Sequence, residues 1–270
     1  SKSPACAAKG LNTDDSAALK KNWTLTVNDI LAENGIGEML AWYDGVRGTN
    51  ADEYETGIAT NFWDTLFWGG IDSLASIDPD MGIILSSPDY LYFDFPYDVN
   101  PDERGYYWGT RFNSVYKVFT YAPENLPQMA EVSTDRDGNE MNLVTPDSFM
   151  PNIRGMQGQT WSETIRTDDQ YGEMAFPRAI SVAERAWHKA SWELDWTPGA
   201  SYNMATGLVP KDELAEDYNG FVSVLGCREV LKLEKLGITY RVPPPGAVIS
   251  LGTLSANSEL PCTPIMYSID

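Results

Sequence analysis

Two short stretches of the sequence each place an aromatic ring and a carboxylate two residues apart. Tyr92 and Asp94 stand in "GIILSSPDYLYFDFPY", where Tyr90 precedes them at the same spacing, and Trp161 and Glu163 stand in "QTWSE". Side chains two apart along an extended segment point to the same face, so each pair should face one cleft together. A ring offers a flat apolar surface, and a carboxylate accepts hydroxyl hydrogen bonds of about 1.5–3 kcal/mol each. This combination suits a pyranose ligand.

The rings follow predicted strands. Four segments read as strands, and each ends in or near an aromatic residue: 36–45 with Trp42, 57–64 with Trp63, 82–87 with Tyr92, and 152–163 with Trp161. In a parallel sheet of alternating strands and helices, the carboxyl ends of the strands meet at one rim. We therefore expect the four rings to surround one hollow.

Helical segments alternate with these strands. The pattern predicts helices over 13–34, capped by Thr13 or Asp14, and over 69–77, 171–194 and 210–236, with a loop-rich region at 95–150. Strands that alternate with helices are typical of an α/β fold. From residue 238 the chain turns β-like and rich in proline, which indicates the start of a small β-domain. The sequence thus divides into 1–237 and 238–270.

Composition excludes several classes of function. Hydrophobic residues make up 43% of the chain and the formal charge is −20, so a nucleic-acid partner is disfavoured. No apolar run is long enough for a membrane span, and the chain has a single histidine, His188, expected on a helix surface. Neither a metal site nor a cofactor is expected. The three cysteines, Cys6, Cys227 and Cys262, allow one disulfide, and nothing in the sequence selects the pair.

Four longer motifs resemble a known family. The stretches "NFWDTLFWGG", "SSPDYLYFDFPYDVNPDERGYYWGTRF", "APENLPQMAE" and "FPRAISVAERAWHKASWE" closely resemble bacterial chitobiases, which are family 20 β-N-acetylhexosaminidases. The resemblance covers nearly the whole chain. It implies a (β/α)₈ barrel with accessory domains, removal of terminal N-acetylglucosamine from chitobiose and related oligosaccharides, and a periplasmic or secreted or cell-surface location. It also implies a substrate-assisted retaining mechanism, in which the acetamido carbonyl of the sugar attacks the anomeric carbon.

The resemblance assigns a role to each of the six residues. It implies Trp42 and Trp63 as walls of the acetamido pocket, Tyr92 as the phenol that stabilises the oxazolinium, Asp94 and Glu163 as binders of the O4 and O6 hydroxyls, and Trp161 as the platform beneath the reacting ring.

One family hallmark is missing from the sequence. His-x-Gly-Gly-Asp-Glu carries the orienting Asp and the acid Glu of the family, but the only Gly-Gly here, Gly69–Gly70, is followed by Ile71. The dipeptide Asp52–Glu53 stands in a polar loop and is not expected to replace it. The strands therefore resemble the fifth to eighth of the barrel, about four βα units that form its carboxyl-terminal half. We expect the isolated chain to be inactive, and to need the other half of the barrel, a partner chain or self-association to cover its open sheet edges.

Two alternatives remain open from the sequence. The chain could belong to a non-catalytic sugar-binding protein that keeps the aromatic site without an acid pair. In a weaker alternative, Glu163 acts as a lone acid whose pKa is raised by an apolar pocket.

Overall fold

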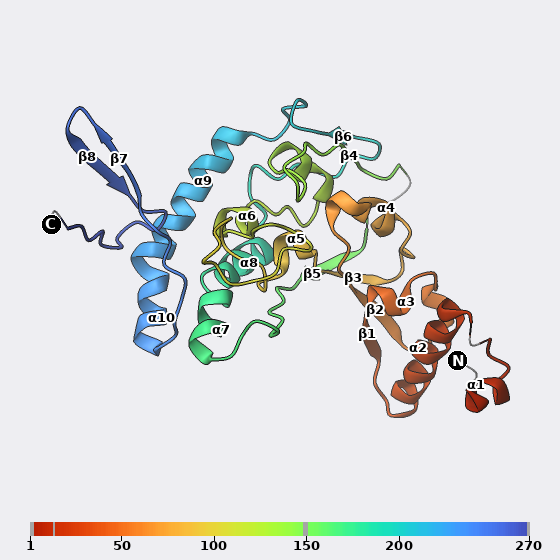
Figure 1. Cartoon of the computed structure of the whole chain (residues 1–270). Coiled ribbons are helices and arrows are strands. Elements are labelled where there is room, and N and C mark those ends of the chain that lie inside the picture. Colours follow the sequence, from red (N-terminus) through yellow and green to blue (C-terminus); the bar gives the residue numbers. More distant parts are fainter. Residues whose placement is uncertain (1–2, 13, 148–150, 269–270) are drawn as a thin grey trace.

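A parallel sheet of four strands forms the centre of the molecule. The computed structural model describes residues 3–12, 14–147 and 151–268. The strands lie in the order β1 (Glu38–Trp42), β2 (Gly57–Phe62), β3 (Gly82–Leu85) and β5 (Ile153–Met156), each parallel to its neighbour (Figure 1). The α/β class expected from the sequence is therefore confirmed. All four carboxyl ends therefore lie at the same edge of the sheet.

Ten α-helices are present in the described ranges. They are α1 (Pro4–Ala8), α2 (Ser16–Glu33), α3 (Tyr43–Val46), α4 (Gly70–Ala75), α5 (Pro88–Leu91), α6 (Val115–Phe119), α7 (Asp168–Ala175), α8 (Arg178–Trp187), α9 (Lys211–Val224) and α10 (Val230–Leu236). Helix α2 begins later than predicted: its N-cap is Asp15, whose side chain accepts a hydrogen bond from the Ala18 amide at 3.0 Å. Asp14 is not the cap, and Thr13 lies outside the described residues.

The predicted helix 171–194 is wrong as a single element. It is two helices, α7 and α8, separated at Phe176–Pro177. The residue before a proline is driven out of the helical region, and Phe176 has φ −110° and ψ 140°, so α7 ends there. Helix α8 ends at Trp187, and the exposed His188 follows as its C-cap, 2.7 Å from Glu184 Oε1.

The main hydrophobic core lies against the sheet. Phe62 and Leu85 are fully buried, and leucines of α2 pack against the same cluster, beside β1 and β2 in Figure 1. Tyr90 also belongs to this core: it is 1% exposed, and its ring centroid lies 5.1 Å from that of Tyr121. The equal spacing of Tyr90, Tyr92 and Asp94 in the sequence therefore does not put all three on one face. The short helix α5 follows β3 and breaks the strand alternation.

The described part of the predicted loop-rich region, residues 95–147, contains regular secondary structure. It contains α6, the 3₁₀ helix η3 (Leu126–Glu131) and strand β4 (Leu143–Val144), which pairs antiparallel with β6 (Ser201–Tyr202). Two other 3₁₀ helices, η1 (Ala51–Glu53) and η2 (Leu66–Trp68), follow β1 and β2.

The carboxyl-terminal part packs onto the rest through α9 and α10. A π-helical turn, η4 (Leu225–Glu229), joins these two helices, and a disulfide links its Cys227 to Cys262, while Cys6 is free. Strands β7 (Gly246–Ser250) and β8 (Thr253–Asn257) form an antiparallel hairpin that projects beyond α9 and α10 (Figure 1). Over the described residues, no helix combines the length and apolarity needed to cross a bilayer.

Candidate functional site

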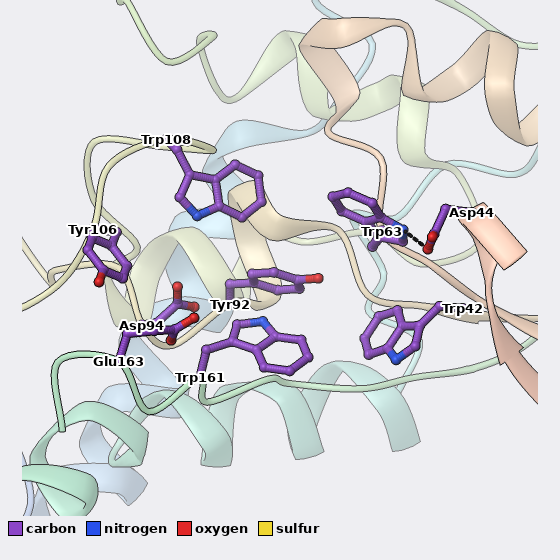
Figure 2. A pocket seen from close by; sticks show the side chains of 9 residues that line it. All are labelled: Trp42, Asp44, Trp63, Tyr92, Asp94, Tyr106, Trp108, Trp161 and Glu163. Atoms are coloured by element: carbon purple, nitrogen blue, oxygen red, sulfur yellow. Dashed lines mark hydrogen bonds between the residues drawn. The ribbon is translucent and has the colours of Figure 1, made fainter. Parts of the chain in front are cut away.

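A cavity of about 450 Å³ opens at the carboxyl edge of the sheet. Its walls contain all six residues singled out from the sequence, together with three others: Trp42, Trp63, Tyr92, Asp94, Trp161 and Glu163, and then Asp44, Tyr106 and Trp108 (Figure 2). Among the described residues, no three side chains of the kinds that ligate metals gather closely enough to hold an ion. The cavity is therefore an aromatic pocket with carboxylates at its walls.

Strands β1 and β2 place the first two rings. Trp42 is the last residue of β1, and Trp63 follows Phe62, the last residue of β2. Asp44, in the first turn of α3, accepts a hydrogen bond from Trp63 Nε1 at 3.2 Å. This bond fixes the orientation of the Trp63 ring, as Figure 2 shows.

Tyr92 and Trp161 do not end their strands, contrary to the expectation. β3 ends at Leu85 and β5 at Met156. The two segments that follow these strands then pair again through a single parallel bridge between Tyr92 and Gln159. The Phe93 amide donates to the Gln159 carbonyl at 2.6 Å, and the Gln159 amide donates to the Leu91 carbonyl at 2.9 Å. The bridge thus restores the parallel pairing beyond α5 and carries both rings to the rim of the sheet.

The rings form a continuous aromatic lining. The Trp161 centroid lies 5.7 Å from that of Trp42 and 5.9 Å from that of Tyr92. On its other side Tyr92 meets Trp108 edge to face, at 5.9 Å and 80°. In Figure 2, Tyr92 lies between Trp161 and Trp108, and its hydroxyl points toward Trp63 and Trp42. Burial raises the pKa of the Tyr92 phenol, so it remains a hydrogen-bond donor at neutral pH.

The two predicted carboxylates lie together at the opposite end of the cavity (Figure 2). Asp94 is 2% exposed, and its Oδ1 has no hydrogen-bond partner among the described residues. Burial raises the pKa of Asp94 to about 6, and the nearby charge of Glu163 adds to the effect. Glu163 itself is exposed. The exposed Glu163 is therefore not enclosed in the apolar pocket that the weaker alternative supposed.

A buried arginine supports the segment that carries Tyr92 and Asp94. Arg178, at the start of α8, donates to the carbonyls of Phe93 at 2.6 Å, Phe95 at 2.7 Å and Asn113 at 3.0 Å. Its guanidinium also attracts the Asp94 carboxylate, which opposes the rise in the pKa of that group. Arg178 was not predicted as a site residue, although it stands in the "FPRAISV" motif.

Three lining residues were also missed. Tyr106 and Trp108 belong to "ERGYYWG", within the longest family-like motif, so the motif was a usable signal. Asp44 had no signal of its own, because it is one of many acidic residues in the chain. Asp52–Glu53 lies outside the cavity lining: Glu53 closes a capping box with Asn50 and forms an ion pair with Lys21.

Comparison with known proteins gives the same assignment over two regions of the chain. Residues 1–190 match the family described as "Glycosyl hydrolase family 20, catalytic domain", and residues 229–270 match "Chitobiase/beta-hexosaminidase C-terminal domain". The chain is 45% identical over 259 residues to the N,N'-diacetylchitobiase of Vibrio harveyi, covering 95% of this chain and 29% of the relative. It is 40% identical over 261 residues to a beta-hexosaminidase of Vibrio vulnificus, covering 90% and 30%. The chain thus spans less than a third of the length of these relatives.

Solved structures agree at the level of the fold. A GH20 exo beta-N-acetylglucosaminidase from Vibrio harveyi, in complex with N-acetylglucosamine, superposes with a TM-score of 0.54 at 23% identity, covering 89% of this chain and 30% of the other. A beta-N-acetylhexosaminidase from Bacteroides fragilis gives a TM-score of 0.53 at 18% identity, covering 90% and 40%. The family match over residues 1–190, which is more than half of the chain, shows that the chain belongs to glycosyl hydrolase family 20.

Proposed function

We propose that this chain supplies the sugar-binding part of a β-N-acetylhexosaminidase that removes terminal N-acetylglucosamine from chitobiose and chitooligosaccharides. The observation that carries the proposal is the cavity itself: the four predicted rings and two adjacent carboxylates, which come from the chain at or beyond the carboxyl ends of the four parallel strands, line one hollow of about 450 Å³. Relatives named as a chitobiase and a beta-hexosaminidase support the same substrate class.

The two ends of the cavity suit the two ends of an N-acetylglucosamine. Trp42 and Trp63 offer apolar surface to the acetamido methyl group, and the Tyr92 hydroxyl, which points toward them, donates to the acetamido oxygen. At the other end, Asp94 and Glu163 accept hydrogen bonds from sugar hydroxyls, and the unpartnered Asp94 Oδ1 gives that bond an acceptor that is already desolvated. Trp161 lies beneath the pyranose ring, between the acetamido group and the hydroxyls that Asp94 and Glu163 bind.

The reaction follows from this pose. The acetamido oxygen bonds to the anomeric carbon as the glycosidic C–O bond breaks, and the leaving oxygen takes a proton from a general acid. Water then attacks the anomeric carbon from the face that the leaving group occupied and gives a proton to the conjugate base of the general acid. The bond from the anomeric carbon to the acetamido oxygen breaks, so the configuration is retained. Tyr92 donates a hydrogen bond that holds the acetamido oxygen in line with the anomeric carbon. The general acid and the orienting Asp of the family have no counterpart in this sequence, which lacks Gly-Gly-Asp-Glu.

The organisation of the protein is part of the proposal. We assign the four parallel strands to one half of an eight-stranded barrel, with the division between domains after Gly237, directly beyond α10. Strands β1 and β5 lie at the two edges of the described sheet, which supports this assignment. We also propose a periplasmic, secreted or cell-surface location, because the Cys227–Cys262 disulfide suits an oxidising compartment.

The second candidate function is sugar binding without catalysis. It is favoured by one observation, the presence of a complete aromatic pocket in a chain that has no Asp-Glu pair at the cavity. The two candidates share the ligand and differ in whether the gene product carries a general acid outside these residues.

Hydrolysis of an aryl N-acetylglucosaminide separates these candidates. We expect the pure 270-residue chain to be inactive, because general acid catalysis contributes about 10²–10⁴-fold and positioning by the orienting Asp adds to it. The natural gene product that contains these residues should hydrolyse the substrate and release the β-anomer first, which NMR detects. A gene product that binds N-acetylglucosamine without turnover would favour the second candidate. Turnover by the pure chain would show that its own residues include the acid, and would contradict the mechanism.

A further inference from the structure

The loop that carries Tyr106 and Trp108 folds back onto the segment of Asp94. The Tyr106 amide donates to the Asp94 carbonyl at 2.9 Å. Gly105 makes this close approach possible: it has φ +136°, and a Cβ there would lie 2.5 Å from the Asp94 carbonyl oxygen. The position of Trp108 against Tyr92 therefore depends on how this loop is held.

Two adjacent residues of the loop bind different parts of the molecule. Arg104 Nη1 donates to the carbonyl of Thr164, the residue after Glu163, at 2.7 Å. Glu103 pairs with Arg241, which donates from Nε to Oε1 at 2.9 Å and to Oε2 at 3.3 Å, with a further contact from Nη2 to Oε1. The side chain of Arg241 is only 20% exposed, and that of Glu103 only 12%. An arginine that contacts both carboxylate oxygens fixes direction as well as distance.

Arg241 is itself held in place. Its amide donates to the carbonyl of Phe176, which joins α7 to α8, at 2.9 Å. Its guanidinium lies 5.8 Å from the centroid of the Tyr97 ring, and Arg178, which supports the Asp94 segment, lies 3.8 Å from the same centroid. The Tyr97 ring therefore lies against both Arg178, which holds the Asp94 segment, and Arg241, which pairs with Glu103 of the loop.

Arg241 comes from a different part of the chain than the cavity residues. It lies within residues 229–270, the region that matches the C-terminal domain, whereas every lining residue of the cavity lies within 1–190. We call Tyr106 and Trp108 the loop wall of the cavity. The ion pair of Glu103 with Arg241 therefore connects residues 229–270 directly to the loop that carries this loop wall.

We propose that Arg241 is a positioning residue for sugar binding: through Glu103 it holds the loop wall in place against the rest of the cavity. The proposal rests on the proposed function, because it assumes that the cavity holds a sugar. The pair contributes no atom to the cavity, so its effect on a ligand must pass through Tyr106 and Trp108. A double-mutant cycle reveals such dependence, since residues that act through one another give effects that do not add.

The first experiment measures loop order without any sugar. Tyr107 is 72% exposed and offers chymotrypsin a cleavage site within the loop. In the gene product that carries these residues, Arg241→Gln should speed cleavage at Tyr107 several-fold, and the charge swap E103R/R241E should restore slow cleavage. Arg228→Gln is the matched control, because it removes an exposed ion pair with Glu229 in the same C-terminal region. Equal cleavage of Arg241→Gln and this control would overturn the proposal.

The second experiment measures binding of N-acetylglucosamine, a monosaccharide with no glycosidic bond to hydrolyse, by calorimetry. Arg241→Gln should weaken binding about tenfold, since the hydrogen bonds that tether the loop are lost. In a Trp108→Ala background the same change should have an effect of about twofold or less. If Arg241→Gln weakens binding equally with and without Trp108→Ala, or if E103R/R241E does not regain affinity, the positioning role is refuted. This holds even if the cleavage assay shows a loosened loop. If the unchanged protein binds no sugar, the proposed function fails, and the cleavage assay still reports separately whether Arg241 orders the loop.

Discussion

The buried Asp94 carboxylate lowers the stability of the folded protein at neutral pH and is proposed to bind the sugar. The substitution Asp94→Asn should therefore raise stability and weaken sugar binding. The side chain is 2% exposed, and burial raises its pKa from the ordinary 3.8 to about 6. The folded protein therefore holds the proton more tightly than the unfolded chain does. Asp94 contributes most to stability below about pH 4, and that contribution is lost as the pH rises through about 6.

The size of the effect follows from the two pKa values. One pKa unit corresponds to about 1.4 kcal/mol, so the change from 3.8 to about 6 corresponds to a penalty of about 3 kcal/mol at neutral pH. Asparagine has nearly the same shape and carries no charge. We expect Asp94→Asn to raise the free energy of unfolding by about 1–3 kcal/mol at about pH 7.5, and to leave it nearly unchanged at about pH 4.

The same substitution should weaken binding of N-acetylglucosamine. The loss of a charge-assisted hydrogen bond costs about 1.5 kcal/mol or more, which is about tenfold in Kd. Urea unfolding at the two pH values measures stability, and calorimetry with the monosaccharide measures affinity. Asp98→Asn is the matched control, because Asp98 is an exposed carboxylate in the same segment. A variant that is no more stable than this control at about pH 7.5, or that binds sugar as tightly as the unchanged protein, would refute the reasoning.

Two further predictions concern the platform ring and the open sheet. Trp161→Ala should weaken binding of N-acetylglucosamine by about 10–100-fold, because it removes the aromatic face beneath the sugar. The control Trp187→Ala removes a ring that is 92% exposed and should leave the affinity unchanged. Calorimetry measures the affinity of both variants, and equal losses would contradict the prediction. The pure 270-residue chain should self-associate, because β1 and β5 lie at the edges of the described sheet and Leu40 of β1 is 53% exposed. Sedimentation velocity measures this, and a monodisperse monomer with a single cooperative melting transition would count against the half-barrel assignment.

Local pattern was enough to predict the elements that carry the cavity. The strands at β1, β2 and β3 lie within the predicted segments, because short apolar runs flanked by turns leave few other conformations. The fourth strand was predicted too long, and the helix over 171–194 was predicted without its break. The break at Pro177 had a signal in the sequence, since a proline restricts the residue before it, and the helical periodicity on both sides concealed that signal.

The tertiary structure decided the parts of the site that depend on distant segments. Trp108 reaches Tyr92 only because the loop from 98 to 108 folds back over Asp94, and no periodicity describes such a loop. The sequence also left the disulfide open among three cysteines, and the packing of the tail against η4 brings Cys227 and Cys262 together.

The order of residues along the chain is enough to predict that rings and carboxylates follow the strands and gather at one rim, because the carboxyl ends of parallel strands share an edge. The electrostatics of that rim depend instead on how the folded chain packs. The raised pKa of Asp94 arises from its burial beneath neighbouring segments and from the proximity of Glu163, which stands far away in the chain. Burial is a property of the packed whole, and so a carboxylate that looks ordinary in the sequence acquires a raised pKa in the folded protein.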